Sequence, residues 1–327
     1  MHKGLITSKG DNIPQTVVEF LYYLRSVKGK SENTIDGYKI DLSIFFKFMK
    51  QYKGGEDEND RLEDIIIHDI DIDFISSIKL PDIYAFINYI TIVRKNGSNA
   101  RARKTAAIKS YYNYMVNKVK LLDENPSLEL EAPKIGKHNP VYLTLNESRQ
   151  LLNAIDGKYK ERDYAIITLF LNCGLRLSEL VGIDLGDIKG DALTVRGKGN
   201  KERAVYLNKA CEASISDYMD IRFDMDVPKE CRALFISQRK SRISKRTVQH
   251  IVDKYLEKAE LTGENYSVHK LRHTAATLMY KYGNVDIRTL QQILGHESVS
   301  TTEIYTHVDD EQVRVALNKN PLAEETK

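Results

Sequence analysis

The side chains with the clearest chemical potential are concentrated in one stretch of the chain, residues 266–307. His269, Arg272 and His273 are spaced i, i+3 and i+4, so a helix would present them on one face. An arginine beside histidines suits a phosphate or a carboxylate, because the planar guanidinium donates to two oxygens at once. Taken singly, each residue also has an ordinary alternative role, as a buried histidine or a surface arginine.

His296 and Tyr305 follow in the same stretch and extend the possible chemistry. A tyrosine acts as a covalent nucleophile when a base and a cationic site for the oxyanion surround it. Because the chain holds 19 tyrosines, Tyr305 by itself is most simply a packed side chain. The functional hypothesis therefore depends on the whole set of groups.

Short capped helices are expected to hold these groups in place. A first helix ends near Gly283, and a second covers residues 286–294 and ends at Gly295, since glycine favours the C-terminal end of a helix. The sequence Ser-Thr-Thr-Glu at 300–303 forms a capping box that starts a third helix.

A second pair of charged residues lies in a strongly apolar segment, residues 162–180, which is broken at Cys173-Gly174. After the break, Arg176 and Glu179 are i, i+3 neighbours, so Glu179 can orient the guanidinium. The alternative is a surface ion pair that contributes about 0–1 kcal/mol. The apolar flanks favour partial burial instead, where an arginine needs an anionic partner.

A hairpin with a basic tip follows. Residues 192–196 and 202–207 alternate as strands, and Gly197-Lys198-Gly199-Asn200-Lys201 lies between them. The flanking glycines would let Lys198 reach into a groove without crowding of the backbone. The alternative is an ordinary solvated turn.

Length and composition indicate a two-domain intracellular protein. The chain has 327 residues and a net charge of +3, which does not by itself indicate nucleic acid. No apolar run approaches the ~20 residues of a membrane span, and the N-terminus lacks the apolar core of a signal peptide. The three cysteines show no paired spacing, as expected of reduced thiols. We therefore expect a cytoplasmic protein without membrane contact.

Four helices are predicted before a proline-containing segment. A capping box at Thr16 opens the first, Ser31 caps the second, and the third and fourth cover residues 81–95 and 99–118. We expect a helical first domain at 1–125, a linker at 126–140 and a second domain at 141–327. The predicted fold class is mainly α, with a small antiparallel β-sheet in the second domain.

Residues 56–73 are rich in carboxylates. A metal-binding cluster is one interpretation, but no ligand spacing stands out, so a solvated loop around short strand-like or helical pieces is favoured.

Basic residues at two predicted helix starts suit the backbone of DNA, although a merely solvated face is the alternative. The predicted DNA contacts are Arg101, Arg103, Lys104 and Lys109 in the first domain, and Arg242, Lys245 and Arg246 in the second.

Five motifs in order resemble the tyrosine recombinases, and most closely their Xer-like members. They are CGLRLSEL, GKGNKER, HKLRHT, LGHES and STTEIYTHV. The four-helix first domain and the total length agree with this resemblance, so it extends over nearly the whole chain. The acidic stretch is longer than the connection usual in Xer proteins, so first-domain contacts do not transfer residue by residue.

The resemblance implies a DNA breaking and rejoining enzyme that needs no metal and no cofactor. Tyr305 would attack a phosphate of the DNA backbone and form a 3′-phosphotyrosyl link. Lys198 would protonate the leaving 5′-oxygen, and the released 5′-hydroxyl would then attack the matching link on a partner duplex.

The resemblance also implies roles for the other charged residues. Arg176 and Arg272 would hold the non-bridging oxygens, with Glu179 orienting the first guanidinium. His269 would accept the tyrosine proton, and His296 would donate to the phosphate.

The partners that the resemblance implies are duplex DNA with paired half-sites and a homo- or hetero-tetramer, with an activating translocase as a further possibility. An apolar stripe after Tyr305 predicts a short helix that must dock on another surface. The resemblance implies docking on the next subunit, and docking on its own domain is the alternative. Either chromosome dimer resolution or movement of a mobile element fits.

Three other functions are alternatives. A type IB topoisomerase shares the phosphotyrosine chemistry, but the compact chain and its tail favour a recombinase. A catalytically silent DNA-binding protein would not need the complete set of charged groups. A zinc enzyme using His269 and His273 lacks the glutamate and the third ligand of the metalloprotease pattern.

Overall fold

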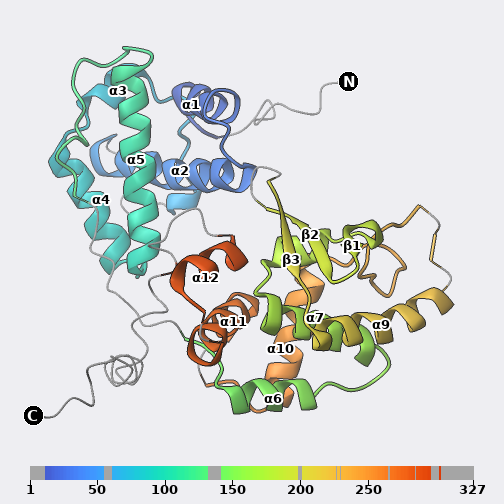
Figure 1. Cartoon of the computed structure of the whole chain (residues 1–327). Coiled ribbons are helices and arrows are strands. Elements are labelled where there is room, and N and C mark those ends of the chain that lie inside the picture. Colours follow the sequence, from blue (N-terminus) through green and yellow to red (C-terminus); the bar gives the residue numbers. More distant parts are fainter. Residues whose placement is uncertain are drawn as a thin grey trace, which may run out of the picture. The chain divides into compact units, whose positions relative to one another are not determined.

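The protein is represented by a computed structural model that describes residues 12–54, 61–131, 141–197, 201–225, 227–228, 230–263, 266–283, 285–295 and 302. The chain divides into two compact units, Met1–Lys137 and His138–Lys327 (Figure 1). Each unit has its own hydrophobic core. The predicted fold class, mainly α with a small antiparallel sheet, is confirmed. No helix within the described ranges is long and apolar enough to cross a membrane.

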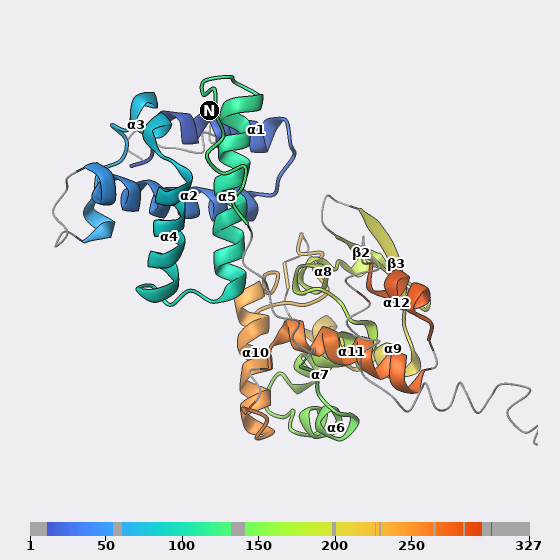
Figure 2. The same ribbon diagram turned by 90° about the vertical axis from the view of Figure 1, so that its left-hand side faces the viewer.

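The described part of the first unit is helical. α4 and α5 lie side by side and α2 crosses both (Figures 1 and 2). In the core of the first unit, the rings of Phe86 and Tyr112 pack edge to face against the ring of Phe45. The elements are α1 (Gln15–Ser26), α2 (Glu32–Gly54), η1 (Leu62–Asp64), α3 (Ile72–Ser77), α4 (Leu80–Ile92) and α5 (Ser98–Asn117).

Two predicted helix starts in this unit are corrected. α1 begins directly after Pro14, so Thr16 lies inside the helix, and its hydroxyl contacts the Tyr111 hydroxyl at 2.7 Å. α5 begins at Ser98, one residue before the predicted start at 99, with Gly97 at the N-cap position and no side-chain cap. A capping pattern alone does not distinguish neighbouring residues, because the backbone conformation that decides the cap depends on packing.

The acidic segment is anchored to the first unit from residue 61 onward. Leu62, Ile65 and Ile67 are buried in the core, and Lys50 binds Asp69 at 2.7 Å. This part agrees with the expectation of a solvated loop around short helical pieces, because its carboxylates are exposed while the apolar residues between them pack inward.

The start of the predicted linker also packs on the first unit. Leu130 is 2% exposed and belongs to the first core, and its carbonyl oxygen accepts a hydrogen bond from Lys109 Nζ at 2.8 Å. Residues 132–140 of the predicted linker lie outside the described residues.

The second unit combines helices with a three-stranded antiparallel sheet in the order β1-β2-β3. The predicted strands pair as a hairpin, with Val195 opposite Arg203 and Leu193 opposite Val205. α7 packs on α9 and α11 in the core (Figure 1). The elements are α6 (Leu145–Asn153), α7 (Lys160–Cys173), α8 (Leu177–Gly182), η2 (Leu185–Asp187), β1 (Ile188–Lys189), β2 (Ala192–Arg196), β3 (Glu202–Tyr206), α9 (Lys209–Asp224), α10 (Lys245–Lys258), α11 (Val268–Tyr282) and α12 (Ile287–Leu294).

Candidate active site

Arg176 lies at the junction between α7 and α8, where a glycine redirects the chain. Gly174 ends α7 with a φ of +59°, a left-handed conformation that glycine adopts readily because it has no Cβ. A Cβ at this position would also lie 2.8 Å from Leu294 Cδ2, so the approach of α12 requires glycine. The turn places Arg176 at the N-cap of α8, with its side chain 37% exposed.

Glu179 and Gly295 hold the Arg176 guanidinium from two sides. Nη1 donates to Glu179 Oε1 at 2.8 Å, and the backbone N–H of Arg176 donates to Oε2 at 2.8 Å. Nη2 donates to the carbonyl oxygen of Gly295 at 2.9 Å. The predicted contact between Arg176 and Glu179 is therefore present in the structure, and Glu179 itself is buried.

Arg272 on α11 brings a second guanidinium to the same carboxylate. Its Nη1 donates to the Gly174 carbonyl oxygen and its Nη2 to that of Leu294, each at 2.6 Å. Nη1 also lies 3.9 Å from Glu179 Oε2. The tertiary fold thus brings together two arginines that the sequence placed in separate motifs.

The Glu179 carboxylate lies among three guanidiniums. Burial raises its pKa, but hydrogen bonds from Arg203 and from the Arg176 backbone outweigh that effect, so the pKa lies below its ordinary value. Arg176, Arg203 and Arg272 together carry three positive charges against this one negative charge. The cluster therefore keeps two positive charges in excess, which suits an anionic ligand.

His269 lies one turn before Arg272 on α11. Partial desolvation lowers its pKa, and the positive charges of Arg272, Lys270 and Arg176 lower it further. The imidazole is therefore neutral at neutral pH and able to accept a proton. The ring of His273 packs edge to face against it, with ring centroids 4.6 Å apart.

An open hollow of about 740 Å³ lies beside these groups. Arg176, His269 and Arg272 line it from one side, and the first turns of α10 line it from another. Lys245 and Arg246, two of the predicted DNA contacts, are exposed and belong to this lining. A basic hollow at the N-terminal end of a helix suits a phosphate group.

Lys198, His296 and Tyr305 lie outside the described residues, and their placement in the site stays a prediction. The described residues next to two of them do reach the cluster. A Cβ on Gly197 would lie 3.6 Å from Glu179 Oε1, and the residue before His296 is the Gly295 whose carbonyl binds Arg176.

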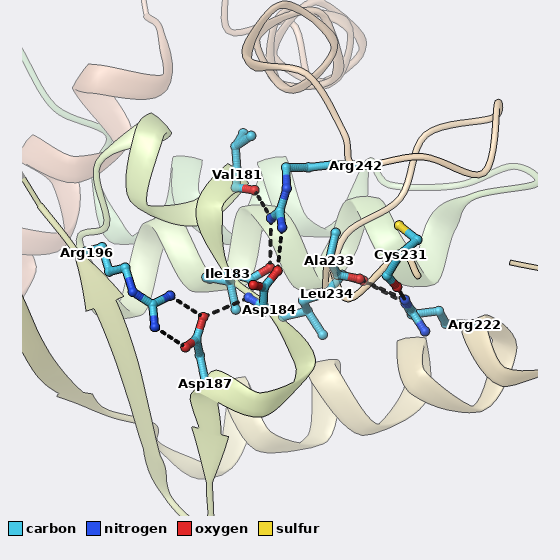
Figure 3. Close-up of polar contacts among 10 residues, drawn as sticks. All are labelled: Val181, Ile183, Asp184, Asp187, Arg196, Arg222, Cys231, Ala233, Leu234 and Arg242. Atoms are coloured by element: carbon cyan, nitrogen blue, oxygen red, sulfur yellow. Dashed lines mark hydrogen bonds and ion pairs between the residues drawn. The ribbon is translucent and has the colours of Figure 1, made fainter. Parts of the chain in front are cut away.

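Arg242 is engaged within the second unit, as Figure 3 shows. Its Nη1 donates to the carbonyl oxygens of Val181 at 2.8 Å and Ile183 at 3.2 Å, and its Nη2 pairs with Asp184. These contacts fasten the end of α8, so the guanidinium has a structural role that the prediction of a DNA contact did not include.

The basic residues at the start of α5 are also largely engaged within their unit. Lys104 is 5% exposed and binds Asp41 at 2.7 Å, so the prediction of a DNA contact is corrected for this residue. Lys109 donates to two backbone carbonyl oxygens at 3.3 and 2.8 Å. Arg103 pairs with Asp41 at 2.8 Å while staying 47% exposed, and Arg101 contacts a threonine hydroxyl at 3.4 Å.

Arg203 is the residue of this cluster that sequence reasoning missed. It lies on β3 and donates to both carboxylate oxygens of Glu179, at 2.5 and 3.1 Å. A signal was present, because residues 203 and 205 of an alternating strand point to one side, and Val205 is apolar. A charged residue on a buried face needs a partner.

Comparison with known proteins points to one family. Residues 141–312 match the model of the phage integrase family, and residues 17–118 match that of the phage integrase N-terminal SAM-like domain. The chain is 57% identical over 312 residues to the tyrosine recombinase XerC of Caldanaerobacter subterraneus subsp. tengcongensis, a match that covers 95% of this chain and 88% of that protein.

Solved structures show the same fold. The XerH site-specific recombinase in its post-cleavage complex with a palindromic difH substrate is 20% identical, with a TM-score of 0.68 and coverage of 97% of this chain and 91% of that one. A lambda integrase tetramer bound to a Holliday junction is 17% identical, with a TM-score of 0.64 and coverage of 87% and 77%.

Proposed function

Because the chain belongs to the phage integrase family and is a site-specific tyrosine recombinase, we propose that Tyr305 is its nucleophile and that the clustered arginines bind the phosphate under attack. The phenolate attacks phosphorus, a 3′-phosphotyrosyl bond forms, and the bond to the 5′-oxygen breaks. The released 5′-hydroxyl then attacks the matching phosphotyrosine on a partner duplex. Each step exchanges one phosphate ester for another, so no high-energy cofactor is required.

The observation that carries this proposal is the excess positive charge around Glu179. A phosphodiester has one negative charge, and the pentacoordinate transition state has two. Arg176 and Arg272 belong to a cluster with two positive charges in excess, held in place before the substrate binds. Preorganised charge of this kind stabilises the transition state more than the ground state.

His269 is the proposed acceptor of the tyrosine proton. Free tyrosine has a pKa near ~10, so it needs a base or nearby cations at neutral pH. The lowered pKa of His269 keeps its imidazole neutral, as a base requires. In this scheme His296, next to Gly295 in the chain, donates to the phosphate.

Lys198 is the proposed general acid for the leaving 5′-oxygen. We expect Lys198→Ala to cleave an ordinary duplex slowly and to recover when sulfur replaces the bridging 5′-oxygen, because a thiolate leaves without a proton. The measurement is single-turnover cleavage of the two substrates. Lys189→Ala, a change in the same sheet, is the control and is expected to cleave both like the unmodified protein. If sulfur brought no recovery, Lys198 would be assigned to DNA binding.

The proposed substrate is duplex DNA with two half-sites, bound by four subunits. This assembly is supported by the XerH complex with a palindromic substrate and by the lambda integrase tetramer on a Holliday junction. The tail after Tyr305 is the proposed link between neighbouring subunits. We place the reaction in the cytoplasm, with activation by a DNA translocase as part of the same proposal.

Chromosome dimer resolution, a step of chromosome partition at cell division, is the proposed process. It is supported by the similarity to XerC proteins over almost the whole chain. Selection of bound sequences from random duplexes tests it. We expect a dyad of two inverted half-sites around a short spacer, and recombination between two copies of that dyad. A selected site without symmetry, or DNA relaxation that needs no paired sites, would contradict the proposal.

A further inference from the structure

Arg203 forms a bidentate ion pair with the buried carboxylate of Glu179, which also accepts a hydrogen bond from Arg176. Its Nη1 lies 2.5 Å from Glu179 Oε1 and its Nη2 lies 3.1 Å from Oε2, which matches the geometry of a guanidinium–carboxylate fork. The side chain is only 17% exposed, and Glu179 Oε1 accepts from Arg176 as well. The position of this carboxylate therefore depends on two arginines at once.

The other face of Arg203 packs against Gly295. A Cβ on Gly295 would lie 2.9 Å from Arg203 Cδ, 3.0 Å from Nε and 3.1 Å from Cζ, so only glycine allows this approach. Gly295 also has a φ of +63°, in the left-handed region. Its carbonyl oxygen accepts the hydrogen bond from Arg176 Nη2 at 2.9 Å. Arg203 thus contacts both groups that hold the Arg176 guanidinium.

We propose that Arg203 is a positioning residue for DNA cleavage, which fixes Glu179 and Gly295 and through them the guanidinium of Arg176. The inference rests on the catalytic role proposed above for Arg176. Arg203 donates to both carboxylate oxygens of Glu179, so its fork is directed at the carboxylate. Its Nε is buried and makes no hydrogen bond within the described part of the chain, so one N–H donor of Arg203 has no acceptor there.

The charge of Glu179 links Arg203 to the reaction. Burial raises the pKa of Glu179, and the hydrogen bond from Arg203 is the foremost effect that lowers it. Among the residues that the structure describes, Arg176, Arg203 and Arg272 are the cations that face this carboxylate. Without Arg203, Glu179 takes up a proton at a higher pH, and a protonated carboxyl group holds Arg176 more weakly. The loss of rate is therefore expected to grow as the pH falls.

The first test compares Arg203→Gln and Arg203→Lys with Arg196→Gln. Arg196 lies in the same hairpin and pairs with Asp187 and Glu202, and Figure 3 shows its contact with Asp187. We expect Arg203→Gln to slow single-turnover cleavage of a nicked duplex by about 10- to 100-fold, the usual effect of losing a supporting partner. Binding of one half-site should stay within about threefold. Arg203→Lys should recover part of the rate, and Arg196→Gln should cleave normally.

A double variant separates positioning from a direct contact. If Arg203 acts through Arg176, then Arg176→Lys combined with Arg203→Gln is no slower than Arg176→Lys alone. A double variant whose loss equals the product of the two single losses would overturn the proposal, because Arg203 would then act independently. Cleavage by Arg203→Gln at the normal rate would overturn it as well.

Two further measurements keep the outcomes distinct. The loss of cleavage rate in Arg203→Gln should increase as the pH is lowered, whereas a loss independent of pH would contradict the role through Glu179. Thermal melting shows whether Arg203→Gln is folded. If Arg203→Gln is not folded, Arg203→Lys is tested in its place. We expect Arg203→Lys to cleave slowly and to melt at the normal temperature. Normal cleavage by Arg176→Lys would defeat the proposed function itself, whereas slow Arg176→Lys with normal Arg203→Gln would defeat only this inference.

Discussion

Replacing Tyr305 with phenylalanine is expected to abolish covalent protein–DNA complexes while folding and DNA binding remain intact. The change removes one hydroxyl group, and that oxygen forms the proposed bond to phosphorus. A duplex nicked beside the cleavage point traps the adduct, because the short fragment released by cleavage diffuses away and cannot rejoin. The adduct is then measured as a slowly migrating band on a denaturing gel.

A second tyrosine on the same unit provides the control. Tyr282, the last residue of α11, is 69% exposed, so Tyr282→Phe removes a hydroxyl at low cost to packing. We expect this variant to form the adduct in normal yield. An adduct of normal yield in Tyr305→Phe would refute the assignment of the nucleophile.

Loss of either proposed phosphate-binding arginine, Arg176 or Arg272, is expected to slow cleavage strongly. Arg176→Ala and Arg272→Ala should each lose ~10²-fold or more in single-turnover rate, the scale of losing one donor to a developing oxyanion. Arg272 is 2% exposed and donates to two backbone carbonyl oxygens, so its alanine variant also leaves buried acceptors without partners. Arg272→Lys keeps the charge but loses the fork, and it tests the same role in a less disturbed core.

The substrate itself can show that these arginines act on the phosphate. A methyl group in place of one non-bridging oxygen removes a negative charge from the phosphate. The loss of cleavage rate caused by Arg176→Ala should therefore be smaller on that substrate. Arg196→Ala is the control, since its side chain is 43% exposed and pairs away from the cluster. Equal deficits of Arg176→Ala on both substrates would indicate that Arg176 does not neutralise the phosphate.

The sequence alone determined the local geometry of this protein. The i, i+3 spacing predicted the contact between Arg176 and Glu179, and the glycine at 295 predicted the end of α12. The alternation of residues 192–196 and 202–207 predicted the hairpin. These features depend on interactions between residues close in sequence, for which periodicity and capping residues are direct signals. The order of the motifs was specific enough to indicate the family.

Only the tertiary structure decided which charged residues share a partner. Lys104 looked like a surface cation, but Asp41 on α2 pairs with it in the interior of the first unit. Arg203 looked like part of a basic hairpin, but its fork meets Glu179 from another element. The exposure of a long basic side chain depends on what distant segments place beside it, and a buried cation is stable only with such a partner. That information is carried by the packing of the elements, which the spacing of residues along one segment does not contain.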